Sequence, residues 1–401
     1  MLRLSRTLAG IYLLLAAAIT AYTLLIAPMG WAPFQLDTVG PAGAPVTITI
    51  AYSTEKEQWL NEAVTRFEAE KPRVGGRPIQ IELRGMGSRE IVSEIVDNRY
   101  QPTVISPASM LQIEQLRSAW AARRGGQIIG DGGNAPQPLV ITPMVLVAYA
   151  ERAAVIDQAG TGDTFWENLN RALTTPNGWQ DLGGQQGWGR VKFAHTSPET
   201  SNSGLQTLLL LAYGYYRNTG DLTIDQVRSG EFRDWLGGVE GAVPGQFIDS
   251  TNTLMTDMLR FGPSKYDFIS VYENLAIESM PLAERQGHKL RVFYPPANII
   301  SDHPYAVLDA PWVGAAERAA ATQFRDFLLS SEMQRLALND YGFRPANPGI
   351  RIDPNDANSP FNRYAAAGIR LDIAEQVAVP SGDVIDTLVA TWRSAANMTL
   401  R

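Results

Sequence analysis

The chain has 401 residues, of which 45% are hydrophobic and 19% are charged. This is enough apolar material for two globular lobes, and it excludes a disordered protein. The 41 acidic and 34 basic residues give a net charge of -7, without long runs of either sign, so nothing predicts a nucleic-acid partner. The absence of cysteine excludes disulfides, thiolate metal sites and a cysteine nucleophile.

An apolar segment opens the chain. Arg3 and Arg6 precede an uncharged stretch from Leu8 to Phe34, and about 20 apolar residues can span a bilayer as a helix. Because the early arginines favour a cytoplasmic N-terminus, the rest should lie outside the cytoplasm, held at the cell membrane. We predict a transmembrane anchor or signal segment over residues 1–29, and we favour an uncleaved anchor because no small-x-small cleavage site is evident. Residues 30–45, rich in proline and glycine, are predicted to form a tether.

From Val46 onward, strand patterns alternate with helical patterns. Val46–Tyr52, Ile79–Leu83 and Thr103–Ile105 are predicted strands, and each precedes apolar residues at helical spacing. Thr54 and Glu57 fit a capping box at the start of the first helix. Three strand-then-helix units predict a parallel sheet with helices on both faces, hence an α/β lobe.

A second lobe is expected after the apolar run Leu139–Tyr149, which is interrupted by Pro143. The later elements predicted are strands at Val191–Ala194, Phe268–Val271 and Tyr305–Leu308, and helices at Gly204–Tyr216 and Ala315–Leu329. The predicted division is residues 46–142 for the first part of lobe 1, 143–303 for lobe 2, and 304–401 for a return to lobe 1 plus C-terminal helices.

Small polar residues recur where the predicted strands end and helices begin. They are Ser53-Thr54, Gly87-Ser88, Ser106 with Ser109, and Thr196-Ser197 with Ser201-Asn202-Ser203-Gly204. Ligands of open parallel sheets bind at such positions, where hydroxyls, backbone N–H groups and helix dipoles favour a small polar or anionic ligand. The same residue types are also preferred helix caps, so capping remains the alternative at each position.

Tyr272 and Glu273 follow a predicted strand of the second lobe. A carboxylate facing the cleft would disfavour an anion and suit a cationic or hydroxyl-rich ligand. If Glu273 instead pairs with an arginine or caps a helix, it carries no information about the ligand.

Catalytic motifs are lacking in the sequence. His195, His288 and His303 are scattered without metal-site spacing, and there is no G-x-S-x-G elbow, Walker loop or G-x-G-x-x-G after a strand. His195 beside Thr196 and Ser197 suggests a base and nucleophile of an anchored hydrolase, but no orienting acid is identifiable. We therefore predict a protein that is not an enzyme and has no cofactor or metal.

Several segments occur in an order typical of one family. They are Ser106-Pro107-Ala108-Ser109, Thr196-Ser197-Pro198, Tyr272-Glu273-Asn274, His303-Pro304-Tyr305 and Gly342-Phe343-Arg344-Pro345. From about Val46 to Pro348 the chain resembles bacterial extracellular solute-binding proteins of the type II periplasmic-binding fold, in the branch of molybdate- and sulfate-type receptors. The resemblance implies two lobes joined by hinge strands, a small-molecule solute enclosed between them, and delivery to an ABC-type permease or another envelope protein.

The resemblance also implies the ligand positions. They fall on Ser53, Thr54, Gly87, Ser88, Ser106 and Ser109 in the first lobe, and on Thr196, Ser201, Asn202, Ser203 and Tyr272 in the second, with Glu273 added as a candidate. The alternative to transport is a membrane-tethered sensory or scaffold module that keeps this fold and acts through a protein partner.

Overall fold

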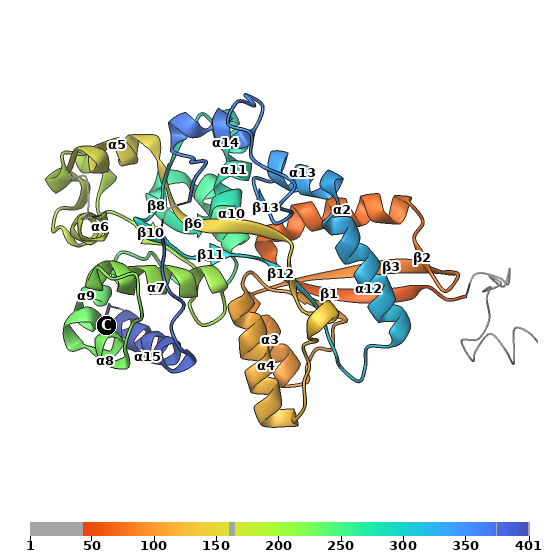
Figure 1. The fold of residues 1–401 in the computed structure, drawn as a ribbon. Coiled ribbons are helices and arrows are strands. Elements are labelled where there is room, and N and C mark those ends of the chain that lie inside the picture. Colours follow the sequence, from red (N-terminus) through yellow and green to blue (C-terminus); the bar gives the residue numbers. More distant parts are fainter. Residues whose placement is uncertain (1–42, 160–164, 374, 400–401) are drawn as a thin grey trace, which may run out of the picture.

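The computed structural model describes residues 43–159, 165–373 and 375–399 as two α/β lobes side by side (Figure 1). The predicted anchor at residues 1–29, and the predicted tether as far as residue 42, lie outside the described residues. Within the described ranges, no helix is both long enough and apolar enough to cross a membrane.

Lobe 1 is built on a sheet with strand order β2-β3-β1-β4-β12-β5. β1 (Val46–Ser53) pairs in parallel with β3 (Arg77–Met86) and β4 (Val104–Ser106). β12 (Pro304–Val307) adds to β4 in the antiparallel direction, and β2 (Arg73–Val74) and β5 (Gln137–Pro138) form the edges. The predicted parallel core is confirmed.

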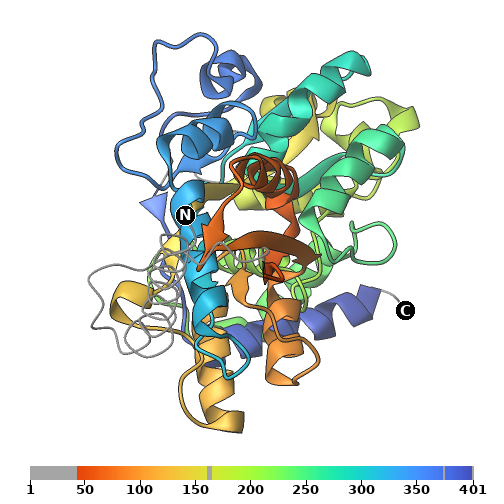
Figure 2. The same cartoon turned by 90° about the vertical axis from the view of Figure 1, so that its right-hand side faces the viewer.

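Alternation along β1 sends its side chains to two separate cores. Val46, Ile48 and Ile50 pack with α2 (Glu57–Ala69), α12 (Ala315–Leu328) and α13 (Ser331–Asn339). Ala51 packs on the opposite face with α3 (Ser88–Val96) and α4 (Met110–Arg124). Figure 2 shows α2 on one side of this sheet and the α3 and α4 pair on the other, as the strand-helix alternation predicts.

Lobe 2 surrounds a second sheet with strand order β11-β6-β8-β7. β6 (Val140–Tyr149) pairs antiparallel with β8 (Phe268–Tyr272), and β8 pairs in parallel with β7 (Phe193–Ala194). β9 (Leu290–Phe293) also pairs with β6. Helix α7 (Asn202–Tyr216) is buried along most of its length, consistent with its apolar run from Leu208 to Tyr213.

The remaining elements of lobe 2 cover this sheet and α7. They are α5 (Ala150–Ala159), α6 (Phe165–Thr174), α8 (Ile224–Arg228), α9 (Gly230–Glu240), α10 (Thr251–Phe261), α11 (Glu273–Arg285), α14 (Pro360–Arg363), α15 (Gly382–Thr399), and the strands β10 (Ala297–Asn298) and β14 (Glu375–Gln376).

The described chain passes between the lobes three times. β6 begins with Val140 in the core of lobe 1 and ends with Tyr149 in the core of lobe 2. The chain returns between β11 (Ile300–Ser301), which pairs with β6, and β12. It then crosses again at β13 (Arg344–Pro345), which also pairs with β6, so that α14 and α15 pack on lobe 2. The sequence did not reveal this last crossing.

The predicted capping box at Thr54 and Glu57 is wrong. The chain forms a single 3-10 turn over Thr54–Lys56 before α2, and neither turn nor helix has a side-chain cap. The Thr54 hydroxyl instead lies 2.8 Å from the Ser250 hydroxyl of lobe 2. The Thr54 hydroxyl therefore contacts lobe 2 instead of capping the helix.

Candidate ligand site between the lobes

The carboxyl ends of β1 and β4 meet at the edge of the lobe 1 sheet that faces lobe 2. In register, Tyr52 of β1 lies opposite Ser106 of β4, which places Ser53 and Ser106 side by side at that edge. The Ser53 hydroxyl lies 3.4 Å from the backbone oxygen of Ser106, and both residues are buried. Two of the predicted ligand positions are therefore adjacent.

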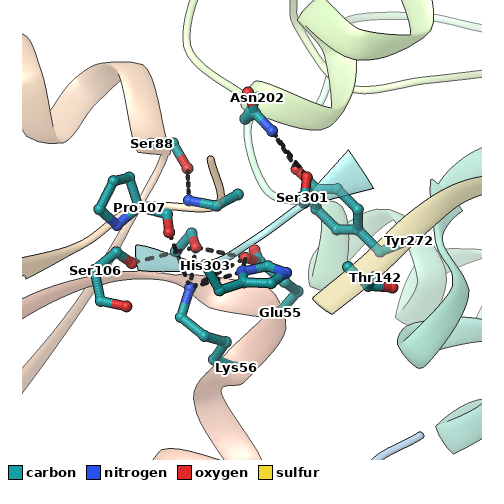
Figure 3. Close-up of polar contacts among 12 residues, drawn as sticks. Glu55, Lys56, Ser88, Ser106, Pro107, Thr142, Asn202, Tyr272, Ser301 and His303 are labelled. Carbon is teal, nitrogen blue, oxygen red and sulfur yellow. Dashed lines mark hydrogen bonds and ion pairs between the residues drawn. The ribbon is translucent and has the colours of Figure 1, made fainter. Parts of the chain in front are cut away.

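A buried charged cluster fills this edge (Figure 3). The Lys56 Nζ atom lies 2.5 Å from the Ser53 Oγ, 3.1 Å from the His303 Nδ1 and 3.3 Å from the Glu55 Oε1. The same Glu55 oxygen lies 2.5 Å from the Ser53 Oγ and 3.1 Å from the His303 Nδ1. We call Ser53, Glu55, Lys56 and His303 the Lys56 cluster.

Burial and charge set the protonation states of the cluster. Burial alone would raise the pKa of the Glu55 carboxyl, but the Lys56 ammonium and hydrogen bonds from His303 and Ser53 lower this pKa to about 2. Burial, reinforced by Lys56, lowers the pKa of His303 to about 4. Burial also lowers the pKa of Lys56, although Glu55 opposes that shift. At neutral pH the cluster therefore holds the Glu55 carboxylate beside a neutral imidazole, with the Lys56 Nζ at ion-pair distance from the carboxylate.

Lobe 2 presents a polar group opposite this edge. Asn202, the first residue of α7, donates from Nδ2 to the Tyr272 hydroxyl at 2.9 Å and to the Ser301 hydroxyl at 3.3 Å. Its Oδ1 accepts a hydrogen bond from the Gln112 Nε2 of lobe 1 at 2.9 Å. The Ser301 hydroxyl also donates to Gln206 at 3.1 Å. Asn202 thus links helix α7, strand β8, the crossing strand and the other lobe.

Further contacts hold the two lobes together around these groups. The Asn274 Nδ2 donates to the Glu55 backbone oxygen at 3.2 Å, and the Arg89 backbone N–H donates to the Thr200 oxygen at 3.1 Å. Gly87 also lies close to lobe 2, because a Cβ atom built on it would lie 2.7 Å from the Thr200 oxygen. The structure is therefore a closed form in which any side chain at position 87 would meet the backbone of lobe 2.

Four residues that belong to the Lys56 cluster, or bond to it or to Asn202, carry a buried polar atom without a hydrogen-bond partner. These atoms are the Ser106 Oγ, the Gln112 Oε1, the Asn274 Oδ1 and the His303 Nε2. Buried polar atoms are normally paired, and each one that is not calls for an explanation. Their gathering between the lobes identifies this region as the candidate site.

Other predicted positions form contacts within their own lobe. The Ser109 hydroxyl accepts from the Leu111 N–H at 3.2 Å as the cap of α4, and the Ser88 hydroxyl accepts from the Ala108 N–H at 3.0 Å. At Ser109 the capping alternative therefore describes the observed contact.

A chain of hydroxyls connects predicted positions inside lobe 2. The Ser203 Oγ lies 2.7 Å from the Thr196 Oγ1, 3.1 Å from the Ser201 Oγ and 2.5 Å from the Thr251 Oγ1. These hydroxyl contacts hold the first turn of α7, and hence Asn202, in place within lobe 2.

Glu273 lies apart from the Lys56 cluster. Its carboxylate accepts two hydrogen bonds of 2.7 Å from Arg344, at Nε and Nη2, and another from the Tyr294 hydroxyl. Burial raises the pKa of Glu273, and the Arg344 guanidinium opposes that shift. The arginine-paired alternative is the one observed, so Glu273 ties α11 to the crossing strand β13 and carries no information about the ligand.

His195 also differs from its considered role as a base. Its Nδ1 lies 2.8 Å from the Thr196 oxygen, and its Nε2 lies 3.2 Å and 3.3 Å from the two Glu240 oxygens. Burial would lower the pKa of His195, but Glu240 raises it overall. Because both ring nitrogens already face acceptors, neither is available to take a proton from Ser197. Glu240, on α9, is an acid that sequence spacing did not reveal.

Sequence reasoning noted Asn274 as an amide beside Tyr272 and Glu273 at a strand end. It missed five other members of this interface, which are Glu55, Lys56, Gln112, Ser301 and His303. The adjacent charges Glu55 and Lys56, placed at a strand end where hydroxyls were expected, were the available signal. Nothing local marks His303, which lies 247 positions from Lys56 in the chain. Among the described residues, no group of three or more His, Asp or Glu side chains is arranged to hold a metal ion.

Two α/β lobes with polar strand ends facing each other across crossing strands define a ligand-binding protein of the periplasmic-binding type. The family model of bacterial extracellular solute-binding proteins matches residues 48–344, and the chain belongs to that family.

Individual relatives agree with this assignment. A sulfate-binding protein of Synechococcus elongatus is 25% identical over 341 residues, covering 84% of this chain and 83% of the relative. The solved structure of the sulfate-binding protein SubI from Mycobacterium tuberculosis matches with a TM-score of 0.52 at 17% identity, over 84% of this chain and 96% of that one. A periplasmic thiamin-binding protein matches with a TM-score of 0.58 at 11% identity, over 89% and 99%. The two structures share the fold.

Proposed function

We propose that the chain captures a small polar or anionic solute between its lobes, outside the cytoplasm, and presents it to an ABC-type permease. The observation that carries this proposal is the set of fully buried, unpaired polar atoms on Ser106, Gln112, Asn274 and His303 between the lobes. A solute bound there would satisfy them and would stabilise the closed form by contacting both lobes. The sulfate-binding relative supports an anionic solute. The predicted N-terminal anchor would keep the receptor at the membrane, beside its permease.

Thermal unfolding of the full chain in detergent, against oxyanions, sugars, amino acids and metal ions, tests this proposal. A solute that binds the folded state must raise the melting temperature, by an amount that grows with its concentration. In Asn202→Ala the rise should shrink, because the link between Gln112, Tyr272 and Ser301 is lost. The matched control is Asn358→Ala, an exposed loop position, which should respond like the wild type. No shift with any class of compound would contradict solute capture.

A sensory or scaffold module with the same fold is the second candidate. It is supported by the direct hydrogen bonds between lobes, such as Thr54 to Ser250 and Gln112 to Asn202, because these can hold the closed form without help. Capture of a permease by the full chain that depends on solute would favour transport. Capture of another envelope protein, unaffected by solute, would favour the scaffold.

A further inference from the structure

The Glu55 carboxylate occupies a position built like an anion site. One of its oxygens, Oε1, lies within 3.3 Å of a hydroxyl, an imidazole nitrogen and an ammonium, on Ser53, His303 and Lys56. Its side chain is 3% exposed. Such charge-assisted contacts are the ones that a small oxyanion makes in proteins. Glu55 thus resembles a bound anion that is attached to the chain.

The surroundings hold more hydrogen-bonding capacity than Glu55 uses. The Ser106 Oγ and the His303 Nε2 are buried in the same neighbourhood and unpaired. Ser106 adjoins Ser53, and His303 is part of the Lys56 cluster itself. A buried ion pair with a purely structural role would leave no reason for unpaired groups beside it.

Lobe 2 helps to hold residue 55 in place. The Asn274 amide donates to the Glu55 backbone oxygen at 3.2 Å, and the negative charge of Glu55 contributes to the raised pKa of Tyr272, after burial. Both residues belong to lobe 2. When the lobes separate, Glu55 stays on the single 3-10 turn Thr54–Lys56 of lobe 1 and loses this hydrogen bond from lobe 2.

Resting on the proposed function, we propose that Lys56 is the charge-bearing contact for the solute, and that the solute is a small oxyanion which replaces the Glu55 carboxylate on Lys56. Glu55 is then an internal competitor. It neutralises the buried ammonium until solute enters, because an unpaired buried charge is costly.

Replacement of one anion by another has a proton consequence. The titratable groups facing Glu55 are Lys56, His303 and Tyr272, and Asp302 acts on Lys56 from the crossing segment. Two anions beside a single ammonium repel each other, so entry of the solute draws a proton onto Glu55 or His303. Anion affinity therefore rises as the pH falls.

The first test uses Glu55→Gln, which removes the competing charge and keeps the shape of the side chain. Calorimetric titration with sodium sulfate and, separately, sodium acetate, at ionic strength matched with sodium chloride, should show binding at least tenfold tighter than in the wild type. The double variant E55Q with Lys56→Met should lose this gain. Glu70→Gln, at the far end of α2, makes the same charge change and should match the wild type. Equal affinity in E55Q and the wild type, or a gain that survives in the double variant, would overturn the proposal.

The second test uses the unmodified chain and so does not depend on the folding of any variant. Titration of the same anions in two buffers with different ionisation enthalpies should show uptake of about one proton per anion bound. Binding without proton uptake would overturn the proposal. So would the absence of binding of both anions to the wild type and to E55Q. If solute capture itself is wrong, the wild type will bind no compound, while E55Q will still bind an anion through Lys56. If a neutral solute binds tightly, and with equal affinity in the wild type and E55Q, solute capture is supported and the role of Lys56 is rejected.

Discussion

At the scale of single residues, the Lys56 cluster buries charged side chains whose removal from water costs free energy. A lysine amine with no exposed surface is tolerated because Glu55 compensates its charge and the Ser53 hydroxyl accepts one of its hydrogen bonds. At this lobe interface, two apolar side chains of similar size would cost less free energy to bury than Glu55 and Lys56 do. Cost of this kind is common at functional sites.

Breaking the ion pair should destabilise the fold strongly. Lys56→Met leaves the Glu55 carboxylate buried and uncompensated, so the free energy of unfolding should fall by about 3–5 kcal/mol. Denaturant titration followed by circular dichroism measures this change. Arg66→Met, which breaks the exposed pair with Glu62, should change stability little. Similar losses in the two variants would show that the buried pair has no special role.

The depressed pKa of Glu55 predicts a pH dependence with a definite sign. The folded-state pKa of about 2 lies below the ordinary value of 4.5, so the unfolded state binds more protons between those values. The stability that Glu55 contributes is therefore fully present above about pH 4.5 and is lost as the pH falls toward about 2. The difference in unfolding free energy between the wild type and E55Q should narrow from about pH 6 to about pH 3. A constant difference would contradict the assignment.

At the scale of elements, close backbone approach between the lobes depends on a glycine at the start of α3. Gly87 has a φ of -63°, which alanine adopts without strain, so its role is to leave room for Thr200. The helix would form equally well with a side chain there. The closed arrangement of the two lobes would not form without displacing Thr200.

Gly87→Ala should therefore separate folding from closure. The added methyl group meets the Thr200 oxygen, and overpacking of this kind costs about 1–3 kcal/mol. That cost falls on the closed form, so solute affinity should drop by about one to two factors of ten while the stability of the unliganded chain changes little. Gly187→Ala, where no neighbour lies within 4 Å, is the control. A loss of stability without a loss of affinity would place the effect in lobe 1 itself.

Much of this element-level picture could be predicted from sequence, because β1, β3, β4 and the helices after them are marked by local periodicity. Hydroxyls at the strand ends were found for the same reason. The Lys56 cluster could not be assembled, since His303 reaches it through a return crossing between β11 and β12. The crossing at β13 was missed because two residues carry no strand pattern. The partner of Glu273, Arg344 in β13, was missed with this crossing.

At the scale of the whole molecule, three chain crossings near β6 connect two lobes whose cores are largely separate. Ala108 and Leu338 of lobe 1 are the buried residues that pack with the core of lobe 2. Contacts between the lobes include hydrogen bonds at Thr54, Glu57, Arg89, Gln112 and Asn274. Such an interface can open and reclose at small cost, and a solute can shift the balance by contacting both sides.

The distance between the lobes in solution tests closure over a solute most directly. The chain has no cysteine, so Ser118→Cys on α4 and Ser394→Cys on α15, both exposed, can carry a pair of spin labels without background labelling. Pulsed dipolar spectroscopy should show a population with separated lobes that converts to the closed distance as a stabilising solute is added. A single distance, unchanged by every solute that raises the melting temperature, would contradict the account.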